Sequence, residues 1–473
     1  MPSINPSATR RLDDWSASPL TPAADWINSS SICARLATFN KEGRREVLEL
    51  SIDRPLTIGR HPACSYVVSD IVASGIHCKL YAVRPSNGGV LVSCSDFSTN
   101  GLLLNGHKIR KTSVLLMDGD TIQIPHSQKF ECIHVHKSPQ KTHIFDPTPP
   151  MNPLLKTKRI GRYIVTSHCL GSGSFATVHL AMDTAAFRQV ACKTIKRKSK
   201  DKVDKVMKEV DILIALDHPN INRVWAAKHD NSFVHIFLEL CTGGDLFSYI
   251  VGHENSRLCE GEAKYMMFQL LKGLKYLHDR LISHRAKPEN ILLYTPGPYP
   301  RIQIADFGLA RPKAYQETFN VCGTVSYLPP EGILALDHKH LGYVGMPADC
   351  WSAGVIMYIM LAGGHPFDYD KQDGESNWYS YRPSEVLDNS QVGDLSQSSV
   401  QSDRMVKKRI VHGEVEFPPY IWSAIPDAQT LCGNLLVYDP LDRATVHSAL
   451  RNVWFTRDAS DLEAAYRERM GSS

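Results

Sequence analysis

The chain has 473 residues, of which 43% are hydrophobic and 22% are charged, and its formal net charge is +4. At about 150 residues per domain this length predicts two or three globular domains, and the small net charge gives no support for a nucleic-acid-binding protein. The twelve cysteines include no CxxC pair, which favours free thiols over a disulfide or zinc framework.

The first third of the chain predicts a tail, a β-domain and a linker. Residues 1–32 are rich in Ser, Pro, Ala and Asn and lack the apolar core of a secretory signal, so we expect a flexible tail. Residues 33–138 carry short apolar stretches separated by turn signals such as Asn105-Gly106 and Asp118-Gly119, which indicates an all-β sandwich. Five prolines in residues 139–158 predict an extended linker.

The rest of the chain predicts a β-rich lobe followed by a helical lobe, that is, a bilobal α+β fold over residues 159–457. Apolar residues at helical spacing predict one buried helix stripe: Ala263, Met267, Leu270, Leu271, Leu274 and Leu277. The longest apolar run, near Trp351–Gly363, is too short to cross a bilayer, which takes about 20 residues, so we expect no association with a membrane. Residues 369–405 are polar and predict a disordered insertion, and 458–473 are expected to be a C-terminal tail. Three strands are expected first: Tyr163–Leu170, Thr177–Met182 and Gln189–Ile195.

Several short motifs in this second part follow one another in a fixed order. Leu170–Val178 is a glycine-rich segment in which Gly171 and Gly173 let the backbone fold closely over phosphates. Lys193 ends a strand-like stretch, and Glu209 lies on the helix expected next. Asp306-Phe307-Gly308 and Pro329-Pro330-Glu331 follow, and then Asp349, Trp351 and Arg443.

These motifs resemble those of the protein kinase family over nearly all of residues 159–457. The resemblance implies ATP and Mg²⁺ as cofactors, with Lys193 on the phosphates, Glu209 as its partner, and Asn290 and Asp306 on the metal. It also implies that Lys287 acts on the γ-phosphate, that Leu238 is the gatekeeper, and that Arg443 pairs with Glu331. Among the remaining nucleotide contacts that it implies, Glu239 and Cys241 offer backbone hydrogen bonds to adenine and Asp245 reaches the ribose. The others are Leu170, Gly171, Gly173, Val178 and Ala191.

The catalytic loop departs from the family pattern. The family reads His-Arg-Asp-x-Lys-Pro-Glu-Asn, whereas this chain reads His284-Arg285-Ala286-Lys287-Pro288-Glu289-Asn290, one residue shorter and without the aspartate that serves as base. Either the aspartate is deleted, or it became Ala286 and the following residue was lost. A silent kinase, an engineered inactive form, and a one-codon gap from a sequence fault or alternative splice are the competing explanations.

The segment between Asp306 and Glu331 indicates the substrate class. Cys322–Tyr327 resembles the corresponding segment of Ser/Thr kinases, and Thr318 and Thr324 are candidate activation-loop residues. Glu289 and Asp245 are acidic where basophilic relatives recognise arginine, which predicts an Arg-x-x-Ser/Thr preference.

The β-domain carries a second set of motifs: Gly59-Arg60, Ser74–His77, Asn100-Gly101 and Asn105-Gly106. They resemble the forkhead-associated (FHA) family, which binds phosphothreonine. The resemblance implies that Arg60 and Ser74 bind phosphate, that Asn100 holds the peptide backbone and that His77 braces the loop. Gly75 stands where a basic residue is frequent.

An FHA domain ahead of a Ser/Thr kinase resembles the checkpoint kinase 2 family, and the compact layout is closest to fungal meiotic checkpoint kinases. This implies a checkpoint role in meiosis or DNA damage, a nuclear location, and as partners a phosphothreonine-containing adaptor or a neighbouring copy in a phosphorylation-dependent homodimer. Ser390-Gln391 and Ser396-Gln397 are candidate sites for SQ-directed kinases. The alternative function is a phosphopeptide-binding scaffold with a silent kinase domain.

Overall fold

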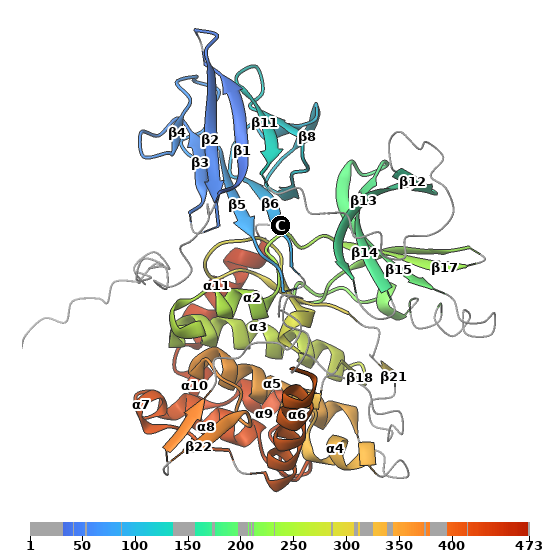
Figure 1. The fold of residues 1–473 in the computed structure, drawn as a ribbon, viewed down its shortest axis with the longest axis vertical. Coiled ribbons are helices and arrows are strands. Elements are labelled where there is room, and N and C mark those ends of the chain that lie inside the picture. The colour runs from blue at the N-terminus through green and yellow to red at the C-terminus, as the bar shows by residue number, and fades with distance from the viewer. Residues whose placement is uncertain are drawn as a thin grey trace, which may run out of the picture.

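The computed structural model describes residues 32–135 and 157–471, with gaps at 41, 53, 87, 173–175, 197–206, 208–209, 211, 231, 285–286, 307–310, 313–324, 338–343, 373–374, 379–394 and 414. Most of the tail expected at 1–32 and of the linker expected at 139–158 lies outside the described residues. The described chain forms an N-terminal sandwich, a strand lobe and a helical lobe (Figure 1).

The N-terminal sandwich consists of a six-stranded and a five-stranded sheet, with strand orders β2-β1-β11-β10-β7-β8 and β4-β3-β5-β6-β9. Side chains that alternate between buried and half-buried along β5 show why these residues form strands with one face toward a core. Both sheets contribute to that core, in which Leu36, Ile58, Leu80 and Cys94 are fully buried. The strands are β1 Ile32–Phe39, β2 Arg45–Ser51, β3 Leu56–Gly59, β4 Tyr66–Val67, β5 Cys78–Val83, β6 Leu91–Asp96, β7 Leu102–Leu104, β8 His107–Ile109, β9 Ser113–Leu115, β10 Thr121–Gln123 and β11 Lys129–His134.

The strand lobe is one six-stranded sheet with the order β12-β13-β14-β15-β17-β16. Its neighbouring strands pair antiparallel throughout. The three strands expected from the sequence are confirmed, each within a few residues. The bounds are β12 Thr157–Ile160, β13 Tyr163–Ser172, β14 Ala176–Asp183, β15 Arg188–Lys196, β16 Val224–His229 and β17 Phe233–Glu239.

The helical lobe holds helices α2 to α11 together with three short antiparallel strand pairs. The strand pairs are β18 Ile282–Ser283 with β21 Arg311–Pro312, β19 Ile291–Leu293 with β20 Ile302–Ile304, and β22 Tyr369–Gln372 with β23 Glu375–Trp378. The helices are α2 Leu246–Val251, α3 Glu260–His278, α4 Pro330–Asp337, α5 Gly345–Ala362, α6 Leu395–His412, α7 Pro419–Trp422, α8 Pro426–Leu435, α9 Val446–Leu450, α10 Val453–Thr456 and α11 Ala459–Gly471, with 3-10 turns η2 Glu254–Ser256, η3 Pro288–Asn290 and η5 Val325–Tyr327.

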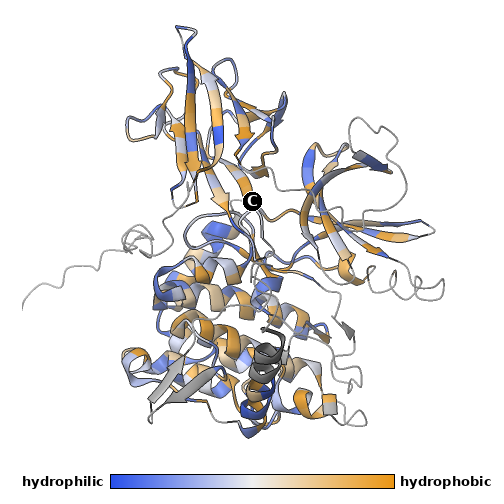
Figure 2. Ribbon diagram, in the orientation of Figure 1, coloured by the Kyte–Doolittle hydropathy of each residue, from blue (hydrophilic) through white to orange (hydrophobic). Residues whose placement is uncertain are grey.

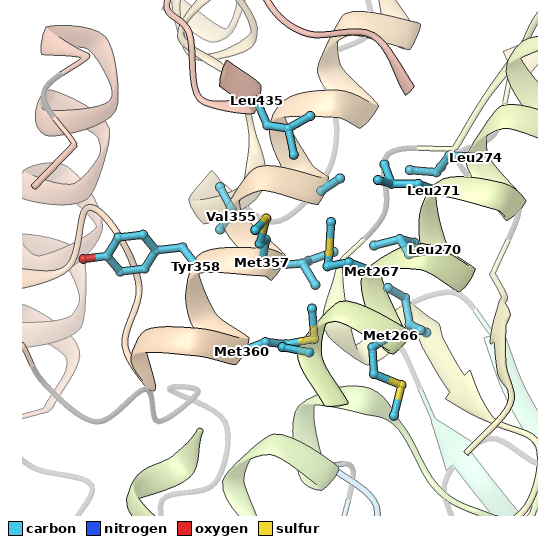
Figure 3. Close-up of a cluster of buried hydrophobic side chains, with 14 of the residues drawn as sticks. Met266, Met267, Leu270, Leu271, Leu274, Val355, Met357, Tyr358, Met360 and Leu435 are labelled. Carbon is cyan, nitrogen blue, oxygen red and sulfur yellow. The ribbon is translucent and has the colours of Figure 1, made fainter. Parts of the chain in front are cut away.

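Helices α3 and α5 form the centre of the helical lobe. The six apolar residues of the expected α3 stripe are all buried, which confirms that prediction. Met267 and Leu271 of α3 and Val355 and Met357 of α5 belong to the same cluster (Figure 3). Burying each such side chain stabilises the fold by about 1.5–3 kcal/mol. Helix α5 is long and apolar enough to cross a membrane, but 83% of it is buried inside the fold, as expected of a core helix.

Two segments of the helical lobe differ from the sequence expectations. Residues expected to be a C-terminal tail form α11, whose Leu462 and Tyr466 are buried in the lobe core. The end of the expected polar insertion is the first part of α6, and the later α6 residues Val406 and Ile410 are buried. The two buried residues named in each helix are four positions apart, so they lie on one side of the helix, which packs inward. Figure 2 shows hydrophobic residues among hydrophilic ones on the helices of this lobe.

Candidate functional site

Lys193 and Asp306 come from different lobes and form an ion pair. Lys193 lies on β15, in the middle of the strand lobe, paired with Val178 of β14 and Ile236 of β17. Asp306 follows β20 of the helical lobe and has a φ of +63°, a left-handed conformation that aspartate tolerates better than most residues. The Lys193 ammonium donates to the Asp306 carboxylate. The two side chains predicted to hold a metal-bound triphosphate are therefore brought together.

The described part of the catalytic loop is anchored to the segment that carries Asp306. Asn290 ends η3, and its carbonyl accepts a hydrogen bond of 2.8 Å from the Ala305 amide. The His284 ring Nε2 lies 2.9 Å from the Ala305 carbonyl, and the His284 amide donates to the buried Asp349 carboxylate at 2.9 Å. Asp349 also contacts His278 at 2.9 Å. The sequence marked Asp349 as a landmark, but this anchoring role was not predicted.

The apolar side chains among the predicted nucleotide contacts lie together with the predicted gatekeeper, and we call this group the adenine wall. One cluster includes Leu170 of β13, Val178 of β14, Ala191 of β15 and Leu238 of β17. Gly171 lies at the end of β13, paired with Val178. The wall is therefore assembled from strands that are neighbours in the sheet.

The polar residues predicted to contact adenine and ribose have hydrogen bonds of their own. The Glu239 carbonyl accepts from the Asn222 side chain at 3.0 Å. The thiol of Cys241 lies 3.1 Å from Gln303 Oε1, and burial raises its pKa well above the ordinary value. Asp245 is the N-cap of α2, because its carboxylate accepts from the Ser248 amide at 2.8 Å.

Some predicted site residues lie outside the described residues. They are Gly173, Glu209, Thr318, Thr324 and the two loop residues Arg285 and Ala286. Lys287 is described, half-buried at the start of η3. Their predicted roles, including the consequence of the shortened loop, stay predictions.

The residues around Asp306 fit a magnesium ion held jointly with a nucleotide. Within the described ranges there is no group of three or more His, Cys, Asp or Glu side chains that would hold a metal without help. Mg²⁺ in phosphoryl-transfer sites is usually bound by one or two protein groups and completed by phosphate oxygens and water. A carboxylate at Asp306 and an amide at Asn290 match that requirement.

A hollow of about 490 Å³ opens elsewhere, on the helical lobe. It is lined by residues of α3, α9, α10 and α11 and by His218. Burial, followed by the charge of Lys272, lowers the pKa of His218 to about 4, so that the imidazole is neutral. None of the predicted nucleotide-binding residues lines this hollow.

The predicted phosphopeptide residues gather on loops at one end of the N-terminal sandwich. Arg60 follows β3 and is exposed, and its amide donates to the Ser74 carbonyl at 2.9 Å. The Ser74 hydroxyl accepts from the Thr99 amide at 3.1 Å, and the Asn100 side chain donates to the Val72 carbonyl at 3.2 Å. Three separate loops are thus tied together around Arg60, Ser74 and Asn100.

His77 is fully buried beneath these loops, which confirms its predicted bracing role. Its ring Nδ1 accepts from the Ser74 amide at 3.1 Å, so the proton is on Nε2, which donates to the Gly101 carbonyl at 3.2 Å. Burial lowers the pKa of His77 and keeps the ring neutral. The predicted Asn105-Gly106 turn is also confirmed: both residues have positive φ and join β7 to β8.

Comparison with known proteins gives the same division of the chain. Residues 164–455 match the family described as "Protein kinase domain" and residues 56–125 match "FHA domain". The chain is 32% identical over 452 residues to the meiosis-specific serine/threonine-protein kinase mek1 of Schizosaccharomyces pombe, covering 93% of this chain and 90% of that protein. It is 29% identical to the meiosis-specific kinase MEK1 of Saccharomyces cerevisiae, covering 87% and 83%. It is 28% identical to the serine/threonine-protein kinase RAD53 of the same yeast, covering 85% of this chain and 49% of RAD53.

A strand lobe and a helical lobe that join a strand lysine to an aspartate define a protein kinase domain, and the sandwich with its three tied loops defines an FHA domain. The chain belongs to the Ser/Thr protein kinases that carry an FHA domain and is related to the fungal meiotic and checkpoint kinases.

Proposed function

We propose that this chain binds Mg·ATP between its lobes, transfers the γ-phosphate to Ser or Thr residues of proteins, and is recruited to its targets by phosphothreonine. The observation that carries the proposal is the Lys193–Asp306 ion pair. It joins the two lobes at the point where a triphosphate would need both a cation and a metal-binding carboxylate.

The chain's own residues would divide the work of holding the nucleotide. Lys193 would bind the phosphates, Asp306 and Asn290 would hold Mg²⁺, and Lys287 would approach the γ-phosphate. The bound metal would neutralise charge that develops on the transferred phosphoryl group. The His284–Asp349 contacts fix the start of the loop that carries Lys287 and Asn290, so positioning is supplied by the buried core of the helical lobe.

Because the catalytic aspartate is missing, we expect a low rate of phosphoryl transfer. A base that accepts the substrate hydroxyl's proton typically contributes about 10²–10⁴ in rate. Phosphoryl transfer depends mainly on positioning and electrostatics, so residual activity is expected without the base. A shortened loop would displace Lys287 and Asn290, and misplacement by about 1 Å costs roughly a further 10².

Two loop variants test this account. An aspartate inserted between Arg285 and Ala286 restores both length and carboxylate, whereas Ala286→Asp restores the carboxylate alone. We expect the insertion to raise kcat by at least about 10²-fold with little change in the KM for ATP, and Ala286→Asp to recover less. Equal activity of the native chain and the insertion variant would contradict the account. Resequencing the transcript across codons 284–290 separates a real gap from a sequence fault.

The second candidate function is a phosphopeptide-binding scaffold whose kinase domain does not turn over. The absent carboxylate after Arg285 favours it. Both candidates bind Mg·ATP, so nucleotide binding does not separate them. Transfer of labelled phosphate to a peptide does: transfer by the native chain that is lost in Asp306→Asn supports the kinase, and no transfer by the native chain supports the scaffold.

For the FHA domain we propose a phosphothreonine ligand on an adaptor or a neighbouring copy, which would concentrate the kinase near its substrates and support trans-phosphorylation and dimerisation. Arg60 is exposed, its amide donates to the Ser74 carbonyl, and its guanidinium Nε donates to the neighbouring Ala73 carbonyl at 3.3 Å, which supports the proposal. We expect Arg60→Ala to weaken binding of a phosphothreonine peptide at least tenfold, by about 1.5–3 kcal/mol for a charge-assisted bond, and Arg54→Ala, also exposed, to leave it unchanged. Unaltered affinity in Arg60→Ala would contradict this site.

The substrate and location are also proposals. Glu289 and Asp245 support selection of arginine three residues before the acceptor. A peptide array with no such selection would contradict it. Nuclear location and a role in meiosis or DNA damage are proposed from the relatives.

A further inference from the structure

The N-terminal sandwich contacts the kinase domain through the end opposite its phosphopeptide loops. Strand β5 runs away from these loops toward Val83, and β6 returns from Leu91. Six-residue strands are about 20 Å long, so the two ends of this hairpin are well separated. In Figure 1 the β5–β6 end points toward the kinase lobes, and the phosphopeptide loops face away from them.

Apolar side chains at this end join the predicted adenine wall. Leu91, Leu115 and Met117 of the sandwich belong to the same cluster as the kinase residues, and Leu115 is only 1% exposed. Val114, the preceding residue of β9, packs in the sandwich's own core. Successive side chains of a strand point to opposite faces, so Val114 packs inside the sandwich and Leu115 packs against the kinase domain. The kinase members of the cluster are Leu170, Val178, Leu180, Ala191, Leu238 and Leu240.

A polar contact fixes the register of this docking. The Leu115 amide donates to Gln189 Oε1 at 2.8 Å, and Gln189 Nε2 donates to the Leu115 carbonyl at 2.8 Å. Strand β9 is an edge strand of its sheet, so these backbone groups face outward. The Gln189 side-chain amide therefore satisfies both the backbone donor and the backbone acceptor of Leu115, as a neighbouring strand would.

The predicted ribose ligand is engaged by the same end of the sandwich. Asp245 Oδ2 accepts from the Ser86 amide at 2.8 Å and from the Ser248 hydroxyl at 3.1 Å. Its Oδ1 accepts from the Ser248 amide, and the residue is only 4% exposed. A ribose hydroxyl that donates to this carboxylate would have to replace Ser86.

Further contacts extend across both lobes. A Cβ added to Gly244 would lie 2.9 Å from Val83, and one added to Gly297 would lie 3.4 Å from the Tyr81 hydroxyl. On the strand lobe, the rings of His107 and Phe187 stack at 5.8 Å. The sandwich therefore contacts both lobes beside the predicted nucleotide site.

We propose that the FHA domain is an intramolecular competitor of ATP: its β5–β6 end and β9 dock on the adenine wall and on Asp245, and nucleotide binds only after this end has left. The proposal rests on the proposed nucleotide site. Nucleotide affinity is then reduced by the fraction of molecules that are open, so a chain that is open one time in ten binds about tenfold more weakly than its open form.

The test uses the full chain and three substitutions in the sandwich that leave the kinase sequence intact. Leu115→Asp and Met117→Asp place a charge against the apolar wall. Val47→Asp, on β2 with Val47 already 46% exposed, is the matched control. Mg·ATP binding is measured by calorimetry, and hydrogen exchange of the Ser86 and Leu115 amides is measured with and without Mg·ATP.

We expect Leu115→Asp and Met117→Asp to bind Mg·ATP about tenfold more tightly than the native chain, and Val47→Asp to match it. In the native chain, saturating Mg·ATP should speed exchange of the Ser86 and Leu115 amides. Equal affinity in all four proteins, with exchange unaffected by nucleotide, would overturn the proposal.

The same experiment distinguishes an absent nucleotide site from an absent docking contact. If no protein in the series binds Mg·ATP, the proposed function is wrong. Docking is then decided by the nucleotide-free exchange data alone. Faster exchange of the Ser86 amide in Met117→Asp than in Val47→Asp would support the docking contact, and equal exchange would refute it.

Discussion

Gly59, which precedes Arg60, has no room for a side chain. A Cβ there would lie 2.2 Å from the Gly75 carbonyl oxygen and 2.9 Å from the His77 amide nitrogen. Gly59→Ala must displace the loop that carries Ser74, so we expect it to destabilise the FHA domain by about 1–3 kcal/mol and to weaken phosphothreonine binding. Gly75→Ala is the matched control, because nothing lies within 4 Å of its added Cβ. Thermal unfolding and peptide titration measure both variants; a Gly59→Ala protein that matches Gly75→Ala would contradict the clash.

His77 makes the same loop sensitive to acid. Burial lowers its pKa below the ordinary value of about 6.5, although the Gly101 carbonyl and Asp96 act in the opposite direction. The unfolded state therefore binds the proton more readily. The stabilisation by neutral His77 is complete above about pH 6.5 and is lost as the pH falls from there toward the folded pKa.

The Ser74 amide reports this change directly, because it donates to the His77 ring nitrogen that would take up the proton. We expect its hydrogen-exchange protection, corrected for the intrinsic effect of pH, to fall below about pH 6.5. The Arg60 amide, bonded to the Ser74 carbonyl, serves as the internal comparison. Exchange is preferable to peptide binding here, since phosphothreonine itself titrates near pH 6. Constant protection of Ser74 down to pH 5 would show that His77 does not titrate in the folded loop.

Residues that act within a short motif could be predicted, and residues that act across domains could not. Arg60, Ser74 and Asn100 lie together on loops at one end of the sandwich, as their motifs predicted, while their role in binding stays a prediction. Gln189 was named only as the start of a strand. Its contact with Leu115 depends on which segment of another domain lies opposite, and no local pattern carries that information.

Among the elements, α4 is held to the end of the helical lobe by one buried ion pair, as predicted for Arg443 and Glu331. The Arg443 side chain is 0% exposed and donates to both Glu331 oxygens at 2.8 and 3.0 Å. It also donates to the carbonyls of Pro347 and Tyr438 at 3.0 and 3.1 Å. A single arginine thus joins α4, the start of α5 and the segment after α8.

We expect Arg443→Met to destabilise the kinase domain by about 3–5 kcal/mol, because it leaves the Glu331 carboxylate without its partner. Adding Glu331→Leu should recover part of that loss, since the uncompensated charge is then gone. Urea unfolding followed by helical circular dichroism measures the kinase domain, because the described FHA residues are β-strands and loops. A double variant less stable than Arg443→Met would contradict this reasoning.

Elements with a strong period were predicted, and elements stabilised by their surroundings were not. The α3 stripe repeats over about four turns, from Ala263 to Leu277, so the sequence identifies it. Helix α11 places Leu462, Ala465, Tyr466 and Met470 toward the core at helical spacing, but this stripe covers fewer than three turns and lies between charged residues. Its place depends on α3, where Lys272 pairs with Glu463 at 2.7 Å, and on the Tyr466 hydroxyl, which donates to the buried Asn220 side chain at 2.7 Å. Tertiary contacts of this kind leave little trace in local periodicity.

For the whole molecule, the sequence predicted the two domains but not their arrangement. The Pro-rich segment predicts a linker between two domains, and the motifs predict the family to which each domain belongs. Only the structure places the β5–β6 end of the FHA domain against Asp245 and leaves Arg60 exposed at the other end. Docked and open forms therefore present the same phosphopeptide loops.

This arrangement predicts that peptide and nucleotide bind independently. A ligand with equal affinity for two states does not shift their equilibrium, however tightly it binds. We expect the Kd of a phosphothreonine peptide, measured by fluorescence anisotropy, to change by less than about twofold on addition of saturating Mg·ATP, with the unphosphorylated peptide as control. Linkage requires the reciprocal result, an unchanged Kd for Mg·ATP at saturating peptide. A reciprocal change of about fivefold or more would mean that docking reshapes the loops around Arg60, and that phosphopeptide binding itself opens the cleft.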